Sequence, residues 1–360
     1  MISDKNFNKE IINKKSALSD VSNEHFEKLA YALKVLETLV ENDIPFVFKG
    51  GTSLLLLINE MNRLSIDIDI LCTKSEKKSI IEKLLSIKTD AFGEIYQQDR
   101  KPKPGIDKAH FVFPYSSRIE EKVEESFVLL DVIFEDNYYS ITQKRPIYND
   151  LFEFEDPQLS VLLPTIDDLI GDKLVAFAPH TCGIKFTDFF KDERPKHIEI
   201  IKQLFDISLL INHMSDVCAV SSTYRRIAQK LIPYTDNVNS VEECLEDTIC
   251  TCSNIISYGE FGSKNEYNIL LDGLKGFNEY VLGKKITNEN LVKMSVKVYI
   301  LATKILHNNA IGKKEIPDAT SFFGKHRQQI QLALQDNELY REFRICAYKN
   351  ALRASKFGTC

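Results

Sequence analysis

The sequence predicts an α+β protein in which a mixed α/β domain, residues 1–164, is followed by an α-helical domain, residues 165–360. Two patterns support this prediction. Segments with helical spacing alternate with short apolar strands through the first 135 residues, whereas almost every segment after Thr165 has helical spacing. The length of 360 residues suffices for two domains, each with its own core. An apolar fraction of 44% and a charged fraction of 27% are typical of globular proteins.

The expected elements follow from the period of the apolar residues and from the residues that interrupt it. Apolar residues recur at helical spacing over 24–42 and predict a helix, which Pro45 closes. Further helices are expected over 53–61 and 75–87, and strands over 46–48, 66–71, 109–115 and 126–135, the last two as an antiparallel pair. Thr165, followed three residues later by Asp168, has the pattern of a capping box and predicts a helix start.

The same features bear on the compartment of the protein. No apolar run approaches the roughly 20 residues needed to cross a bilayer, and residues 1–15 lack the apolar stretch of a secretory signal. The eight cysteines are scattered and form no C-x-x-C pair, so reduced thiols are expected rather than zinc ligands or disulfides. These observations predict a cytoplasmic protein with no membrane partner.

Asp67 and Asp69 carry the strongest chemical signal in the sequence. Side chains two residues apart on a strand point to the same face, so the interleaved Ile66, Ile68 and Ile70 are expected to enter the core. Two neighbouring carboxylates repel each other unless a cation lies between them, and hard oxygen ligands together with substrate phosphates suit Mg²⁺. The alternative is an exposed strand face with two solvated acids.

A glycine pair lies about fifteen residues upstream, between a predicted strand and a predicted helix. Gly50 and Gly51 let the backbone approach phosphate oxygens, and the N–H groups of a helix beginning near Thr52 or Ser53 favour anions. The Ser53 hydroxyl is a further donor. The G-x-x-x-x-G-K-[ST] phosphate loop is absent, and Gly-Gly-Thr-Ser alone is compatible with an ordinary helix cap. Together with Asp-x-Asp it predicts a triphosphate site.

Asp131 is a third candidate, because it is a single carboxylate within the apolar run Phe127–Phe134. An ionised Asp inside such a strand is costly unless it is paired or bound to metal. If its strand neighbours that of Asp67 and Asp69, the three carboxylates are expected to hold two Mg²⁺ ions ~3.5–4 Å apart, an arrangement that drives nucleotidyl transfer. The alternative is a basic side chain paired with Asp131.

These residues together resemble a known family. Lys49-Gly-Gly-Thr-Ser-Leu followed by Arg63-Leu-Ser-Ile-Asp-Ile-Asp-Ile looks like the first motif of the AbiEii-type nucleotidyltransferase toxins, within the DNA polymerase β-like superfamily. Asp131 is similar to the family's third acidic position, and the resemblance extends over residues 40–210. It implies a polymerase β-like nucleotidyltransferase core with a small mixed sheet, an NTP co-substrate, an RNA acceptor such as tRNA, and a cognate antitoxin.

Two later segments extend the resemblance into the helical domain. Gly171-Asp-Lys-Leu resembles the family's lysine motif, and the resemblance implies that Lys173 holds the triphosphate. Lys202-Gln-Leu-Phe-Asp-Ile resembles a motif whose first arginine and first aspartate are replaced here, while Asp206 is retained. Asp206 is expected to orient Lys173 or to help seat the nucleotide, with a surface salt bridge as the alternative.

Two roles stay open in the α/β domain. Arg63 is expected to contact phosphate or, as the alternative, to pair with the site carboxylates. Asp131 is a candidate to deprotonate the attacking hydroxyl, directly or through a bound water.

Three functions are compatible with these features. The first is a metal-dependent nucleotidyltransferase toxin acting on RNA; the second is transfer to a small molecule or a protein side chain; the third is a binding protein that keeps the fold without turnover. The net charge of −6 disfavours a general nucleic-acid binder. The region from Lys304 onward, however, has ten Lys and Arg against five Asp and Glu, and a basic face there suits a polyanion. A solvated basic face is the alternative.

Overall fold

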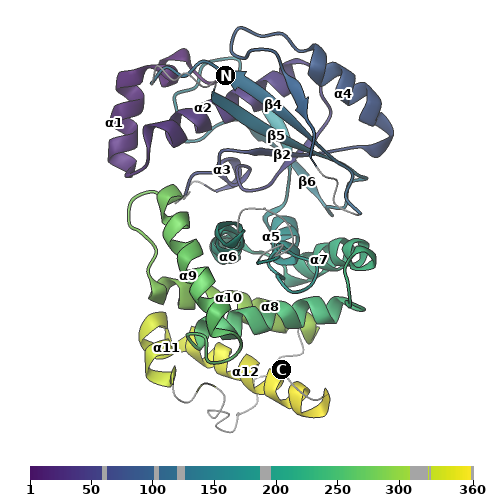
Figure 1. Cartoon of the computed structure of the whole chain (residues 1–360), viewed down its shortest axis with the longest axis vertical. Coiled ribbons are helices and arrows are strands. Elements are labelled where there is room, and N and C mark those ends of the chain that lie inside the picture. The colour runs from purple at the N-terminus through teal and green to yellow at the C-terminus, as the bar shows by residue number, and fades with distance from the viewer. Residues whose placement is uncertain are drawn as a thin grey trace. The chain divides into compact units, whose positions relative to one another are not determined.

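A computed structural model of the chain describes residues 1–58, 63–100, 105–119, 126–186, 196–308, 323 and 326–357, with side chains in the last helix described to residue 351 (Figure 1). The chain divides into two compact units. The first comprises Met1–Thr165 together with Glu279–Lys285, and the second comprises Ile166–Asn278 together with Ile286–Cys360. Each unit is described by itself below.

A seven-stranded mixed sheet forms the centre of the first unit, with the strand order β3-β4-β5-β2-β1-β7-β6. The pairs β2–β5 and β1–β7 are parallel, and the other neighbours are antiparallel. The strands are β1 (Val47–Lys49), β2 (Ile68–Cys72), β3 (Tyr96–Gln98), β4 (Lys108–Tyr115), β5 (Ser126–Phe134), β6 (Thr142–Pro146) and β7 (Ser160–Pro164). The sheet confirms the predicted α+β fold class, including the antiparallel pairing of β4 with β5.

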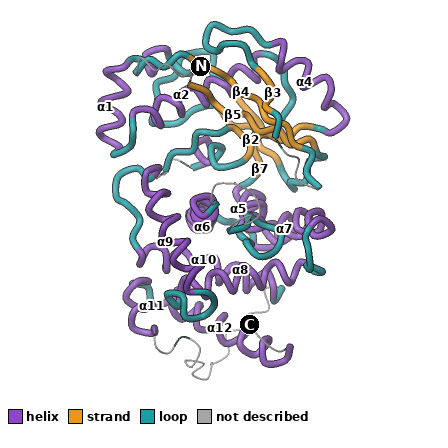
Figure 2. Tube along the Cα trace, viewed as in Figure 1, coloured by secondary structure: helices purple, strands orange, loops and turns teal. Residues whose placement is uncertain are grey.

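Helix α2 (Asn23–Glu41) covers one face of this sheet and packs against β2, β5 and β7. Its N-cap Ser22 accepts a hydrogen bond from the His25 amide, and its apolar face, with Phe26 and Leu29, belongs to the same core as the sheet. The remaining helices of the unit are α1 (Lys9–Ser19), α3 (Leu54–Leu57), α4 (Lys77–Ser86) and the 3-10 turns η1 (Asp4–Phe7) and η2 (Lys74–Glu76). Figure 2 shows helices and strands mixed in this unit.

The alternating burial along strand β5 shows which face of the sheet α2 covers and which face it leaves uncovered. Val128, Leu130, Val132 and Phe134 are fully buried on the face toward α2, because side chains alternate along a strand. The alternate residues, including Asp131, are only partly buried or exposed. The acidic residue of β5 therefore lies on the face that α2 does not cover.

Two element boundaries differ from the sequence prediction. The helix expected over 53–61 covers only Leu54–Leu57, because Ile58 is already extended at φ −133° and ψ 128°; residues 59–62 lie outside the described part. The strand expected from residue 66 begins at Ile68, so Asp67 precedes β2 and is exposed. Strand β6, with the sequence Thr-Gln-Lys-Arg-Pro, has no apolar alternation, as its place at the sheet edge permits.

The second unit is helical (Figures 1 and 2). Its α-helices are α5 (Ile166–Ala176), α6 (His197–Leu210), α7 (Val217–Leu231), α8 (Val241–Ile256), α9 (Lys264–Phe277), α10 (Asn288–Leu306), α11 (Arg327–Leu334) and α12 (Asn337–Phe357), with 3-10 turns η3 (Ile211–His213), η4 (Ile232–Tyr234) and η5 (Asn278–Tyr280). Helix α10 starts with a capping box at Thr287 and packs against α6, α7, α8, α11 and α12. No helix in the described ranges is both long enough and apolar enough to cross a membrane.

His180 links three segments of the helical unit. Its Nδ1 lies 2.7 Å from Oδ1 of Asp247 on α8, and its Nε2 lies 3.0 Å from Oε1 of Glu266 on α9. The amides of His180 and Thr181 donate to Oδ2 of Asp247 at 2.9 and 3.0 Å. The hydrogen bond that the His180 ring donates to Asp247 is the main cause that raises the pKa of His180 to about 9. The imidazolium is therefore the form present at neutral pH.

We predict that this imidazolium makes the stability of the helical unit depend on pH. Because the pKa of His180 is raised in the folded state, its contribution is complete below about pH 6.5 and is lost as the pH rises toward 9. Thermal unfolding of His180→Gln should lose this decline, whereas His213→Gln, a substitution at an exposed histidine, should keep it. Equal pH profiles for His180→Gln and wild type would contradict the assignment.

Candidate active site

Four ionisable side chains stand in one row across the sheet. Lys49 on β1 is in register with Asp69 on β2, Asp69 with Asp131 on β5, and Asp131 with His110 on β4. Because residues directly opposite each other share a face of the sheet, the row places two carboxylates side by side between two basic groups. The sequence argument for a shared metal site was conditional on the strands of Asp69 and Asp131 being neighbours, and they are.

Asp131 has a basic partner on each carboxylate oxygen. Its Oδ1 lies 2.6 Å from Nδ1 of His110, and Nζ of Lys108 donates to its Oδ2. The side chain of Asp131 is 14% exposed and that of Lys108 is 30% exposed. The sequence analysis had named a basic partner as the alternative to a metal ion at Asp131, and the structure contains two such partners. Sequence reasoning missed both partners, although Lys108 and His110 are two residues apart at the start of a predicted strand.

The negative charge of Asp69 is only partly compensated by nearby basic groups. Burial is the main cause that raises the pKa of Asp69 to about 6; Lys108 and Lys49 oppose this shift, whereas Asp131 and Asp67 add to it. Lys49 is itself 8% exposed, and its Nζ donates to the Tyr138 hydroxyl at 2.6 Å. A negative charge at Asp69 is therefore held in a site that would gain from a further cation.

The glycine pair packs against this carboxylate. Gly50 has φ +78°, and a Cβ at this position would lie 2.8 Å from Cβ and 2.9 Å from Cγ of Asp69. At Gly51 a Cβ would lie 2.6 Å from Nη2 of Arg63 and 2.7 Å from Oγ of Ser65. Only glycine satisfies both the left-handed backbone and this close approach at position 50. The glycines are needed because the side chains of Asp69 and Arg63 occupy the space that a Cβ would take. The sequence argument had explained the glycines by the close approach of phosphate instead.

Two buried hydroxyls tie the glycine turn to the acidic segment. Thr52 Oγ1 donates to the Asp67 carbonyl at 2.6 Å, and Ser53 Oγ donates to the Gly50 carbonyl at 2.8 Å. Both residues are fully buried. In this arrangement the two hydroxyls hold the backbone of the turn, and α3, which follows them, is only four residues long.

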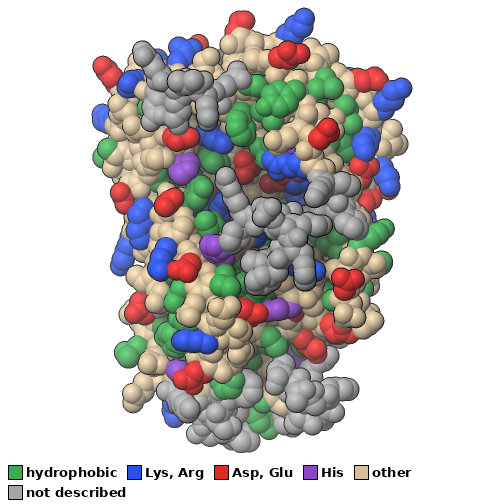
Figure 3. Space-filling model, viewed as in Figure 1, with side chains coloured by type: hydrophobic (Ala, Val, Ile, Leu, Met, Phe, Trp, Pro, Cys, Tyr) green, Lys and Arg blue, Asp and Glu red, His purple; other side chains and the backbone are tan. Residues whose placement is uncertain are grey.

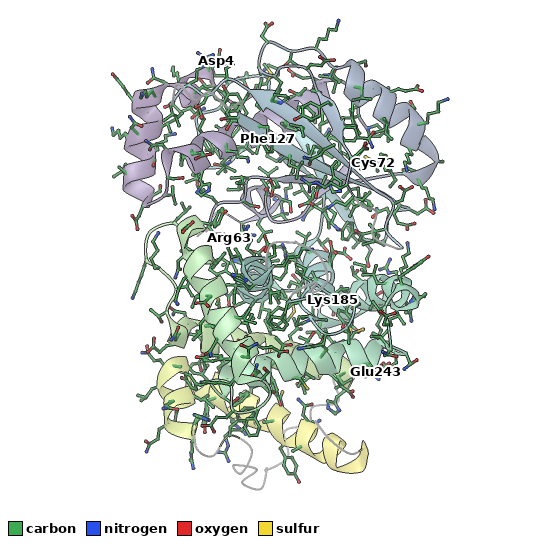
Figure 4. The ribbon with its side chains drawn as sticks, in the orientation of Figure 1. Asp4, Arg63, Cys72, Phe127, Lys185 and Glu243 are labelled. Atoms are coloured by element: carbon green, nitrogen blue, oxygen red, sulfur yellow. The ribbon has the colours of Figure 1, made fainter. Side chains whose placement is uncertain are left out.

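Arg63 lies under the same turn, in the loop that leads to β2 (Figure 4). The residue is 2% exposed, and its Nη1 donates to the Leu64 carbonyl at 3.0 Å. The guanidinium is therefore placed against the backbone of Gly51 rather than in solvent.

Lys173 and Asp206 form a buried ion pair within the helical unit. Lys173 Nζ lies 2.7 Å from Oδ2 of Asp206, and the two side chains are 6% and 1% exposed. They join α5 to α6 and do not form a surface salt bridge. Burying two charges has a desolvation cost that a simple apolar contact would avoid, so the pair is a candidate for function as well as for packing.

The residues of the row suit a divalent cation by their chemistry. Asp69 and Asp131 offer hard oxygen donors on neighbouring parallel strands, Asp67 adds an exposed carboxylate, and Gly50 leaves no side chain in front of Asp69. As the side chains stand, no three His, Cys, Asp or Glu residues among the described residues are grouped as metal ligands. Lys108 and His110 each occupy one acceptor position on the two oxygens of Asp131, and each oxygen keeps a further lone pair for a cation.

Comparison with known proteins decides the family. A family model described as nucleotidyl transferase AbiEii toxin, type IV toxin–antitoxin system, matches residues 34–243, more than half of the chain. The chain belongs to the AbiEii nucleotidyltransferase toxin family. As an AbiEii protein it is a toxin nucleotidyltransferase of a type IV toxin–antitoxin system, as the sequence resemblance predicted. The matched residues include Lys49 through Asp69, Asp131, Lys173 and Asp206.

One solved structure shows a fold that this AbiEii chain shares, and a second is similar to a lower degree. MenT4, a nucleotidyltransferase toxin from Mycobacterium tuberculosis, aligns with a TM-score of 0.51 and 14% identity over 90% of this chain and 98% of its own. JHP933 from Helicobacter pylori aligns with a TM-score of 0.41 and 14% identity over 88% of this chain and 100% of its own. A comparison with curated protein sequences gave no match.

We predict that Gly50→Ala destabilises the AbiEii chain more than Gly283→Ala. Both glycines have positive φ, +78° and +68°, but a Cβ at Gly283 meets nothing within 4 Å. The left-handed backbone alone costs about 1 kcal/mol, so Gly283→Ala should lose about that amount and Gly50→Ala about 1–3 kcal/mol more in urea unfolding. Equal losses would mean that the contact with Asp69 is not tight.

We also predict that Asp69→Asn stabilises the fold at pH 7. Because the pKa of Asp69 is raised from 3.8 to about 6, the folded state binds more protons than the unfolded state in this window, and stability falls as the pH rises through it. Asparagine removes this penalty, which corresponds to about 1–3 kcal/mol at pH 7. Asp67→Asn, a change at an exposed position, should shift the unfolding free energy by less than about 0.5 kcal/mol. A destabilised Asp69→Asn would refute the burial argument.

Proposed function

We propose that this AbiEii toxin transfers a nucleotide from an NTP to an RNA acceptor, with Mg²⁺ bound at Asp67, Asp69 and Asp131. The observation that carries the proposal is the register of Asp69 opposite Asp131, next to the glycine turn at Gly50. Mg²⁺, when bound, would neutralise the triphosphate and polarise the α-phosphate. Membership of a type IV toxin–antitoxin family further implies a cognate antitoxin.

The protein groups have separate tasks in this proposal. Asp67 is exposed and Asp69 half-buried, so the pair presents oxygen ligands at the N-terminal end of β2, where we place the nucleotide. Gly50 leaves room for the Asp69 carboxylate and Gly51 for the Arg63 guanidinium, and Thr52 and Ser53 hold the turn in place. These residues orient the triphosphate, and catalysis of this kind depends mainly on positioning and electrostatics.

Asp131 is proposed as the proton acceptor. The acceptor hydroxyl oxygen attacks the α-phosphorus, its proton passes to Asp131, the bond between the α-phosphorus and the bridging oxygen breaks, and pyrophosphate leaves. His110 and Lys108 hold the two oxygens of Asp131 and so fix its orientation before the substrate binds.

We extend the proposal to Lys173 and Asp206 of the helical unit. Lys173 would bind phosphate as a compact cation, and Asp206, 2.7 Å away, would orient its ammonium group. The support is the burial of the ion pair, since its desolvation cost is understandable if the lysine serves a polyanionic substrate.

The proposed RNA acceptor is supported by charge in the last helix. On α12, Arg341 is exposed and Arg344 and Lys349 are half-buried, while Phe343 and Cys346 are buried on the opposite side. Arg353 and Lys356, which the sequence places on the same basic face, have side chains outside the described part. On the face shown in Figure 3, acidic and basic side chains are interspersed, so the support for RNA comes from α12 and not from this face.

A labelling experiment tests the proposed function. The protein is incubated with each α-labelled NTP in turn, Mg²⁺ and total cellular RNA, and label in RNA is measured. We expect one or more NTPs to be incorporated by the wild type. Asp69→Ala should lose at least about 100-fold of this activity. The substitution removes an oxygen ligand of the proposed Mg²⁺, and with it the stabilisation of the negative charge on the triphosphate. Asp136→Ala, which removes an exposed carboxylate beyond the end of β5, should retain it.

Three results would contradict the proposal. Absence of incorporation by the wild type in the presence of Mg²⁺ would remove the nucleotidyl-transfer assignment. Undiminished labelling by folded Asp69→Ala would remove this residue from the site. Label found in a small molecule or in protein, with none in RNA, would replace the acceptor.

A further inference from the structure

A short segment from the helical half of the sequence belongs to the α/β unit. Residues Glu279–Lys285, here called the return segment, are preceded and followed by residues of the second unit. The return segment lies outside residues 34–243, the part matched by the AbiEii family model. Its contacts below are all within the first unit.

The return segment pairs with the loop that leads to the acidic residues. Val281 forms an antiparallel bridge with Arg63, and the Leu64 amide donates to the Tyr280 carbonyl at 2.8 Å. Val281 is 1% exposed, Arg63 2% and Leu64 0%. The pairing therefore fixes the backbone of Arg63 and Leu64, four and three residues before Asp67, in an environment shielded from solvent.

A continuous line of contacts runs from this pairing to the carboxylates. The Arg63 guanidinium lies against Gly51, where it leaves no room for a side chain, and Gly50 lies in the same way against Asp69. Thr52 completes the line by its hydrogen bond to the Asp67 carbonyl. A shift of Arg63 must therefore move the glycine turn or open a gap behind it.

The return segment is also fixed on its other side. Tyr280 packs against the His25 ring with a centroid separation of 4.7 Å, and the Gly283 amide donates to the Ser19 carbonyl at 3.0 Å. Lys285 Nζ pairs with Oδ2 of Asp20 at 3.2 Å. The segment thus connects the junction of α1 and α2 to the loop of Arg63.

We infer that the return segment is a positioning element of the nucleotidyl-transfer site, with Val281 and Tyr280 as positioning residues. It acts through Arg63 and Leu64, which set the glycine turn against Asp69, and it contacts no substrate. The inference rests on the proposed function. It assigns Arg63 a supporting position under the turn, in place of a phosphate contact.

The test compares two buried valines in irregular segments. Val281→Gly weakens the bridge to Arg63, whereas Val238→Gly removes a side chain of similar burial, 8% exposed, from the helical unit. Amide hydrogen exchange at Leu64 should become faster in Val281→Gly and stay unchanged in Val238→Gly. With the NTP and RNA of the labelling assay, kcat/KM should fall about 10-fold or more in Val281→Gly only, because misplacement of about 1 Å costs up to 10²-fold.

The outcomes separate the inference from the proposed function. Wild-type kcat/KM in folded Val281→Gly, alongside an active wild type, overturns the inference alone. An unchanged exchange rate at Leu64 does the same, since the return segment then does not hold this loop. A wild type that incorporates no nucleotide overturns the proposed function and the inference with it. If Val281→Gly does not fold, Val281→Ala is judged by the same two measurements, with a smaller expected loss of kcat/KM.

Discussion

Two carboxylates placed side by side on neighbouring parallel strands are the constraint on which the first unit depends. Asp69 and Asp131 are in register on β2 and β5, on the face of the sheet that α2 leaves open. Like charges in a partly buried site need compensation, and the row supplies Lys49 at one end and His110 at the other, with Lys108 beside it. The compensation is incomplete at Asp69, whose pKa is raised to about 6. A site poised in this way favours a cation and a polyanionic substrate together.

The backbone of the glycine turn provides the space that the side chain of Asp69 occupies. Gly50 adopts a left-handed conformation and yields its side-chain space to the carboxylate, and Gly51 yields its space to Arg63. The hydroxyls of Thr52 and Ser53 donate hydrogen bonds to backbone carbonyls and so hold this turn in place. The return segment then holds Arg63 and Leu64 from behind. The loop before the acidic residues is therefore held by residues more than 200 positions later in the chain.

The helical unit contributes a second electrostatic feature of a different kind. Lys173 and Asp206 are buried as a pair between α5 and α6, whereas His180 is held as an imidazolium by Asp247 and Glu266. The first pair lies within the part of the chain matched by the AbiEii family, and His180 forms a link between the helix α8, the helix α9 and the loop after α5. We interpret the former as functional and the latter as structural, because only the former puts a lysine and an acid of the family motifs together.

The sequence by itself determined the α+β class and the family, and it predicted the acidic residues of the site. These depend on local signals: the two-residue alternation of Ile68, Asp69 and Ile70, the apolar run around Asp131, and the motif that joins the glycine pair to Asp-x-Asp. Tertiary structure alone decided which groups face these acids. Lys108 and His110 reach Asp131 only through the pairing of β4 with β5, and Val281 reaches Arg63 only because the chain re-enters the first unit. Strand order and long-range return leave no local periodicity, since they are set by the packing of the whole unit.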